Sequence, residues 1–384
     1  MSSKTTIDEV ALIVLGAKAV EIREIPLRVT NDEVDALPVE NQPFLYASGN
    51  WGPGYVSIKG LVGQGEIIPL LVEQLAAQIA ERGLSVDFVA GNITGGVIPG
   101  WQLSQELGTP FVYVGGTRKK EKDETPITMV NKAALKATSE KLCAAIIRSG
   151  VTFNFVAGLV PSGMVLGYSL SQLLSGRLGR VIPFVYVRET RKKGGQKEVI
   201  TGIKNNPYIA PGNSGIVIGQ VTDFSQTVGN GIEAIQEEGF RAIDGAILLR
   251  DFDASAFENI GEIEMDFDQA VSIIPRVSRG IVIEELVNFA QSTCNSADLL
   301  REAGYKIDHA GTILSYNNPE AARALQEHGI KMFYVFTLPD LIAAAERNQT
   351  HPQRVIDDYR RFLADPLGWQ VARGLTPIER GGTI

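Results

Sequence analysis

A pair of adjacent acids and a basic, glycine-rich loop are the two patterns in this chain that could carry chemistry. Glu284 and Glu285 directly follow an apolar run, and the segment from Arg188 to Gly202 reads RETRKKGGQKEVITG. Carboxylates accept hydrogen bonds from hydroxyl groups, and clustered cations bind anionic groups. Two acids that end a strand in solvent would have the same sequence pattern, and so would a solvated basic loop without a function. Each pattern therefore has a structural interpretation beside the functional one.

Histidine and cysteine are scarce in this chain. All histidines lie near the C-terminus, so none is available to the basic loop for acid–base work: His309, His328 and His351. They are also too scattered to predict a metal site. Of the two cysteines, Cys143 falls within a predicted helix and Cys294 in a turn that begins another, and we expect both in the core.

The composition is that of a globular chain with an ample core. Of the 384 residues, 44% are hydrophobic and 21% are charged, with a formal net charge of −8. An acidic balance disfavours binding to nucleic-acid backbones, and no apolar run approaches the roughly 18 residues that span a bilayer. The N-terminal stretch lacks a cleavage site for secretion, and so few cysteines favour a reducing compartment. We expect a cytoplasmic protein that binds neither nucleic acid nor membrane.

Two stretches of sequence each occur twice. Residues 88–120 and 155–193 share FVAG, LSQ, PFVYV and TRKK in the same order. Residues 215–239 and 280–304 share the run GIVI, followed by a Phe–x–Gln pattern and a helix. Along the chain, the order is therefore two copies of a first half and then two copies of a second half.

Short apolar runs alternate with helices throughout these repeats. Helices are predicted at residues 69–82 and 132–149, each followed by glycine, and strands at 86–90, 111–114, 153–157, 184–187, 310–314 and 332–336. This alternation predicts an α/β fold with a doubly wound, mostly parallel sheet. Ligands of such folds bind beyond the carboxyl ends of the strands.

The repeats also predict a division of the chain. It has an N-terminal segment and hood at 1–66, first-half copies at 67–130 and 131–212, and a mobile loop at 188–202 within the second of these. A second-half copy at 213–250, an acidic connector at 251–279 and the other second-half copy at 280–345 follow. A C-terminal helix and tail occupy 346–384.

Several motifs together resemble the orotate phosphoribosyltransferase family, whose fold is the type I phosphoribosyltransferase fold. FLYASGNWGPGYVSIKG at residues 44–60 is similar to the N-terminal hood, and FVAG followed by TGG is similar to the pyrophosphate loop. PFVYVR at 183–188 resembles the strand before the mobile catalytic loop, and VFTLPDL at 335–341 the last strand and helix. The resemblance covers about residues 40–345, with both halves of the fold duplicated.

The resemblance implies transfer of ribose 5-phosphate between phosphoribosyl diphosphate and a nucleobase, with Mg²⁺ as cofactor. Its implied catalytic residues are Arg188, Lys192 and Lys193, and its implied ribose ligands are Glu284 and Glu285. Its implied 5′-phosphate loop is Asn288, Phe289, Ala290, Gln291 and Ser292. Its implied pyrophosphate ligands are Thr94, Gly95, Gly96, Ser162 and Gly163, and Tyr55 is the implied base-stacking residue.

Three further expectations concern how these parts combine. The basic loop and the paired acids both belong to second copies, which predicts that the two second copies form the site together. The phosphate loops lack glycine, and a Cβ there disfavours the positive φ angles that a phosphate cradle uses. A catalytically degenerate module for assembly or ligand binding is the alternative function, and we expect a homo-oligomer in either case.

Overall fold

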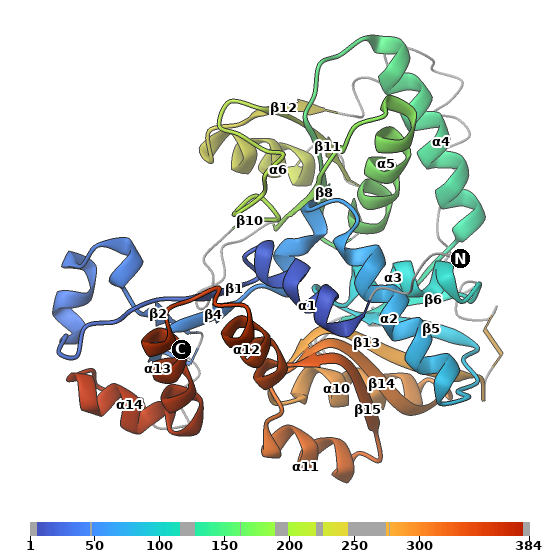
Figure 1. Cartoon of the computed structure of the whole chain (residues 1–384). Helices are drawn as coiled ribbons and strands as arrows, with labels where there is room; N and C mark the ends of the chain where they lie inside the picture. The colour runs from blue at the N-terminus through green and yellow to red at the C-terminus, as the bar shows by residue number, and fades with distance from the viewer. Residues whose placement is uncertain are drawn as a thin grey trace. The chain divides into compact units, whose positions relative to one another are not determined.

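The computed structural model describes residues 6–46, 48–115, 127–161, 163–188, 199–219, 226–244, 274–275 and 277–378. It divides into two compact units (Figure 1). Unit 1 combines residues 1–58, 190–199 and 339–384, and unit 2 combines residues 59–189 and 200–338. Within the described ranges, no helix is both long and apolar enough to cross a membrane.

Among the described residues of unit 2, the larger sheet has six strands in the order β15-β14-β13-β5-β6-β7. All neighbouring pairs are parallel except β6 and β7, which form an antiparallel edge. The strands are β5 (Phe88–Asn92), β6 (Phe111–Val114), β7 (Ile127–Val130), β13 (Arg279–Val287), β14 (Lys306–Ser315) and β15 (Lys331–Thr337).

The second sheet of unit 2 has five described strands in the order β10-β9-β8-β11-β12. Its strands are β8 (Phe155–Leu159), β9 (Phe184–Val187), β10 (Ile200–Thr201), β11 (Ser214–Ile218) and β12 (Arg241–Asp244). Again the pairs are parallel apart from the edge pair, β9 and β10. These parallel, α/β sheets confirm the predicted fold class.

The strand orders correct the predicted pairing of copies. The first copy of the first half, β5 to β7, shares its sheet with the second copy of the second half, β13 to β15. The second copy of the first half, β8 to β10, pairs with β11 and β12. One copy of the unit is therefore inserted within the other. We call the six-stranded unit the outer copy and the five-stranded unit the inserted copy.

Seven helices are described in unit 2, of which the first precedes the first strand and the other six connect strands (Figure 1). They are α2 (Ile67–Glu81), α3 (Val97–Glu106), α4 (Lys132–Ser149), α5 (Gly163–Leu178), α6 (Gln226–Glu237), α10 (Gln291–Glu302) and α11 (Pro319–Glu327), and a 3₁₀ helix, η3 (Ile58–Gly63), precedes them. The two helices predicted at 69–82 and 132–149 are confirmed. Asn318 caps α11, because its side chain accepts a hydrogen bond from the Glu320 amide.

Matched packing makes the duplication visible in the two sheets. A Cβ added to Gly96 would lie 2.0 Å from the carbonyl oxygen of Ile283, and one added to Gly163 would lie 2.3 Å from that of Ile218. Only glycine allows the loop backbone to lie so close to the neighbouring strand. Two more contacts are matched in the same way, Gly280 on Phe88 with Gly215 on Phe155, and Gly100 on Phe111 with Gly167 on Phe184.

Unit 1 contains short strands and helices from both ends of the chain. Its elements are α1 (Ile7–Gly16), β1 (Val20–Ile22), η1 (Asn31–Ala36), η2 (Val39–Asn41), β2 (Phe44–Leu45), β3 (Trp51–Gly52), β4 (Gly54–Val56), α12 (Leu338–Arg347), α13 (Gln353–Ala364) and α14 (Pro366–Arg373). Leu338, the first residue of α12, belongs to unit 2. β1 pairs antiparallel with β4, and β2 with β3.

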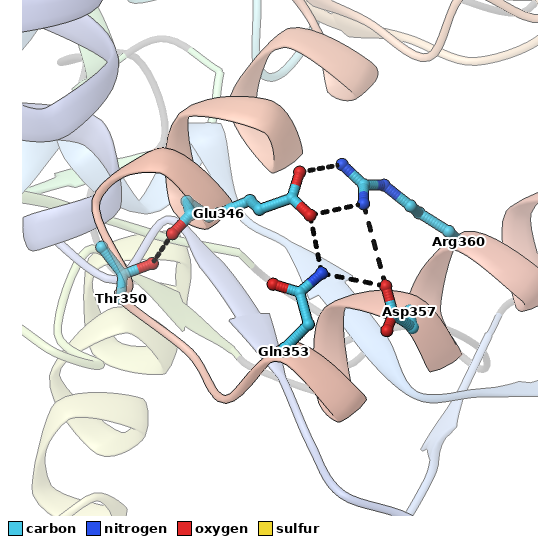
Figure 2. A network of polar contacts seen from close by, with 6 residues as sticks. Glu346, Thr350, Gln353, Asp357 and Arg360 are labelled. Atoms are coloured by element: carbon cyan, nitrogen blue, oxygen red, sulfur yellow. Dashed lines mark hydrogen bonds and ion pairs between the residues drawn. The ribbon is translucent and has the colours of Figure 1, made fainter.

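A polar network links α12 and α13 within unit 1 (Figure 2). Arg360 donates two hydrogen bonds to the Glu346 carboxylate, at 2.9 and 2.6 Å, and Gln353 donates a third at 2.6 Å. The Arg360 hydrogen bonds, followed by that of Gln353, lower the pKa of Glu346 to about 2. Any stability that this carboxylate contributes is present above its ordinary pKa and is lost as the pH falls toward 2.

Candidate functional site

The candidate site lies at the carboxyl ends of two adjacent strands of the outer copy. Because β5 and β13 are parallel and pair from Phe88 opposite Gly280 to Gly91 opposite Ile283, both strands end at the same edge. Asn92 is the last residue of β5, and Glu284 comes directly after the paired part of β13. Their side chains meet there.

The first acid of the pair, Glu284, is held by two donors from different elements. Its Oε1 accepts a hydrogen bond from Asn92 Nδ2 and another, of 2.8 Å, from Ser292 Oγ on α10. Glu284 is buried, with 5% of its surface exposed, and Asn92 with 2%. Burial, followed by the neighbouring Glu285 charge, raises the pKa of Glu284, although both hydrogen bonds act in the opposite direction.

This raised pKa predicts a pH-dependent gain in stability for Glu284→Gln. The unfolded chain releases this proton more readily than the folded one, so the wild type loses stability as the pH rises above the ordinary value of 4.5. Glutamine keeps an acceptor oxygen without the charge. At pH 7–8 we expect the variant to be more stable by about 1–2 kcal/mol, on a scale of about 1.4 kcal/mol per pKa unit.

Denaturant unfolding between pH 4 and 8 measures this effect. The difference between the variant and the wild type should disappear near pH 4, and the exposed Glu106→Gln serves as the matched control. An equal shift at every pH would contradict the assignment.

The turn after β5 packs directly on the second acid. A Cβ added to Gly95 would lie 1.7 Å from Cδ of Glu285 and 1.8 Å from its Oε2, so the carboxylate occupies the space that a side chain would need. The turn begins after a cis peptide between Ile93 and Thr94. The turn from Thr94 to Gly96 thus lies beside the paired acids. The motifs predicted both the turn and the acids, but they paired the acids with the other copy of the turn.

An arginine from the inserted copy reaches the same turn. Arg188 directly follows β9, and its Nη2 donates a hydrogen bond of 3.2 Å to Oγ1 of Thr94. Only 7% of Arg188 is exposed, and no described residue forms a hydrogen bond with its buried Nε and Nη1. Its guanidinium lies 5.7 Å from the ring centre of Tyr186, whose pKa burial raises to about 12. Guanidinium N–H groups that lack a protein partner are the kind of donor that anionic groups accept hydrogen bonds from.

The predicted phosphate loop lies between β13 and α10. Ala290 precedes α10 with φ 60° and ψ 10°, so the loop adopts a positive φ although it lacks glycine. A Cβ disfavours this conformation, as the sequence predicted, and Ala290 adopts it nevertheless. Asn318 Nδ2 donates to Asn288 Oδ1 at 3.3 Å, which ties the loop to the start of α11.

This conformation predicts that Ala290→Gly stabilises the protein. A left-handed alanine costs about 1 kcal/mol, and glycine removes that cost. Because the lost methyl group is buried, we expect a net gain of about 0.5 kcal/mol in the free energy of unfolding. Ala303→Gly is the control, since Ala303 ends the same helix with φ −74° and should lose stability. Urea unfolding that gives both variants the same sign would contradict the prediction.

The structure describes two more of the predicted residues, Gly163 and Tyr55. Gly163 occupies the matching turn of the inserted copy. Tyr55 lies on β4 of unit 1, where its ring is 5.6 Å from that of Phe44. Ser162, Lys192 and Lys193 lie outside the described residues, as do most of the acidic connector and residues 220–225.

The motifs did not predict a role for Asn92. The repeats contain a signal for it, because the outer copy has the polar Asn92 where the inserted copy has the apolar Leu159. Cys143 and Cys294 are buried as expected, and burial raises the pKa of both thiols.

Magnesium would find oxygen ligands at this edge. Among the described residues, no group of three or more histidine, cysteine, aspartate or glutamate side chains could hold a metal. The carboxylates of Glu284 and Glu285 nevertheless supply hard oxygen atoms. The buried Asn92 Oδ1, to which no described residue donates a hydrogen bond, supplies another. Mg²⁺ is typically held by one or two carboxylates together with substrate phosphates, so this set fits.

Comparison with known proteins gives partial matches. No family model matches the chain. Orotate phosphoribosyltransferase from Jannaschia sp. is 33% identical over 103 residues, which cover 27% of this chain and 45% of that protein. The enzyme of the same name from Ruegeria sp. is 30% identical over 99 residues, or 26% and 44% of the two chains. Part of this chain is therefore similar to orotate phosphoribosyltransferases. This similarity confirms the resemblance predicted from the motifs, and the chain spans less than half the length of these relatives.

Solved structures of low sequence identity also resemble the chain. Leishmania donovani UMP synthase is 11% identical, with a TM-score of 0.43 over 94% of this chain and 43% of that one. Orotate phosphoribosyltransferase from Aeropyrum pernix is 12% identical, with a TM-score of 0.41 over 89% and 99%.

Proposed function

We propose that the protein transfers a ribose 5-phosphate unit between phosphoribosyl diphosphate and a nucleobase. The observation that carries the proposal is the convergence of Glu285, Arg188 and the Thr94–Gly96 turn on one strand edge. This edge offers carboxylates for sugar hydroxyls beside a cation for a diphosphate, and the partial relatives are named for such a reaction. The alternative of a degenerate assembly module has no comparable support.

The proposed reaction exchanges one bond at C1′ of the ribose. The C1′–O bond to pyrophosphate breaks, and its electron pair leaves with pyrophosphate. The base nitrogen supplies the electron pair of the new C1′–N bond, and the proton that this nitrogen carried passes to solvent. Negative charge develops on the departing group. Arg188, with two buried donors free, would stabilise that charge, and the backbone of the Thr94–Gly96 turn would orient the diphosphate.

The acids have complementary roles in this proposal. Glu285 would accept hydrogen bonds from ribose hydroxyls. Glu284 would lie next to it, kept in place by the hydrogen bonds that Asn92 and Ser292 donate. Mg²⁺, when bound, would neutralise the diphosphate, with Glu285, Glu284 and Asn92 as its protein ligands. Tyr55 as a base-stacking residue, Lys192 and Lys193 as further cations, and Ser162 and Gly163 as pyrophosphate ligands remain proposals. So does the 5′-phosphate loop from Asn288 to Ser292.

A turnover assay tests the proposal. The purified chain is incubated with phosphoribosyl diphosphate, Mg²⁺ and, in separate reactions, orotate, uracil, adenine or guanine. We expect release of pyrophosphate that depends on one of these bases, together with the matching nucleotide by mass spectrometry. Absence of base-dependent release with every base would reject the proposed function.

A further inference from the structure

The two copies of the fold differ at the positions that form the candidate site. Asn92, Thr94, Glu284 and Glu285 of the outer copy are replaced in the inserted copy by Leu159, Pro161, Gly219 and Gln220. The inserted copy has therefore lost both acids and the amide that holds one of them. A ribose bound there would meet neither carboxylate.

The difference is reversed at one position. Arg188 follows β9 in the inserted copy, and the matching residue after β6 in the outer copy is Gly115. The cation thus persists in the copy that lacks the acids, and the acids persist in the copy that lacks the cation. A site confined to either copy alone would be incomplete.

The packing of the copies explains how these residues combine. Helices α3 and α5, which are equivalent in the repeat, pack against each other within unit 2. Contact between equivalent elements is the arrangement of a two-fold symmetric dimer, here made within one chain. Across it, Arg188 donates to Thr94 of the other copy. The reverse contact, from Gly115 to Pro161, has neither a guanidinium nor a hydroxyl.

We propose that each chain holds one diphosphate-ester site, which the outer copy builds, and that the inserted copy acts as its built-in partner by supplying Arg188. This inference rests on the proposed function and adds its stoichiometry and the source of its cation. The site needs no residue from a second chain.

Calorimetry with phosphoribosyl diphosphate and Mg²⁺ tests the number of sites. The wild type should bind one ligand per chain, and Glu285→Ala should abolish that binding rather than leave a second site filled. Two ligands per chain would overturn the single-site inference while leaving the proposed function standing. No binding at all by the wild type would overturn both.

The source of the cation is tested by arginine variants. Arg188→Ala should weaken binding at least tenfold and leave the stoichiometry at one, because the proposal assigns its buried donors to the diphosphate. Arg148→Ala is the matched control, since Arg148 is exposed on α4 of the same copy. Equal weakening by both variants would show only a loss of net positive charge and would overturn the assignment.

A mixing experiment distinguishes donation within a chain from donation between chains. Glu285→Ala and Arg188→Ala chains are unfolded together, refolded as a mixture and assayed for turnover, with wild type treated in the same way. If each chain completes its own site, the mixture should show no more activity than the two variants measured separately. Recovery toward a quarter or more of wild-type activity would mean that chains share sites, which would overturn the proposal.

Discussion

Glu285→Gln is expected to lower kcat/KM of the proposed transfer by about 100-fold. The substitution keeps the size of the side chain but removes the charge beside the Thr94–Gly96 turn, and single electrostatic contacts of this kind are worth about 10²–10³ in rate. Glutamine still accepts one hydrogen bond from a ribose hydroxyl, so kcat should fall more than KM rises. Steady-state kinetics with phosphoribosyl diphosphate as the varied substrate measure both parameters.

The control for this variant is Glu106→Gln, an identical change on the exposed end of α3. It should leave kcat/KM within about twofold of the wild type. A thermal melt checks that Glu285→Gln remains folded. A folded Glu285→Gln variant that loses less than about threefold would remove Glu285 from the proposed site.

Gly96→Ala is expected to cost about 3 kcal/mol of folding free energy and to abolish ligand binding. Its Cβ would lie 2.0 Å from the carbonyl oxygen of Ile283 and 2.8 Å from the amide nitrogen of Asn92. Both neighbours are strand backbone, which cannot rotate away as a flexible side chain would. The turn must therefore move away from β13, which separates Thr94 from the paired acids.

Urea unfolding and calorimetry measure the two effects of Gly96→Ala. Gly176→Ala is the control, because a Cβ there meets nothing within 4 Å on the exposed face of α5. That variant should gain about 0.5–1 kcal/mol, since alanine favours a helix interior over glycine. A Gly96→Ala protein with unchanged stability would contradict the close packing of the turn on β13.

The sequence patterns predicted the secondary structure of the described repeats well. The predicted strands at 111–114 and 184–187 and the helix at 132–149 match β6, β9 and α4, and other elements are shifted by one to four residues. Local patterns suffice here because buried parallel strands are apolar throughout and because glycine ends the helices.

The pairing of copies was wrong for a physical reason. Both copies of the first half carry FVAG and PFVYV, and both copies of the second half carry GIVI, so either strand could pair with either partner. Periodicity gives the face of a strand but not its neighbour. A role for Asn92 was not predicted, because that role depends on its hydrogen bond to Glu284, which is 192 residues away in the sequence.

The left-handed Ala290 shows a different limit. Alanine rarely adopts a positive φ, so the sequence favoured the opposite conformation. The paired β13 and the buried α10 surround Ala290, which is 4% exposed, and their packing outweighs the local preference. Tertiary contacts of this strength cannot be read from one position.

The insertion of one copy within the other imposes an order on synthesis. Strand β5 leaves the ribosome early, but its parallel neighbour β13 follows only after the whole inserted copy. The backbone amide of Arg279 donates a 2.7 Å hydrogen bond to Asp87, which is 192 residues away in the sequence. Closing so long a loop is slow when the intervening chain is unfolded. An inserted copy that folds first, with β8 and β12 flanking β11, would shorten that search. Early folding of the inserted copy would then speed the pairing of β5 with β13, the two strands that lie before and after it in the sequence.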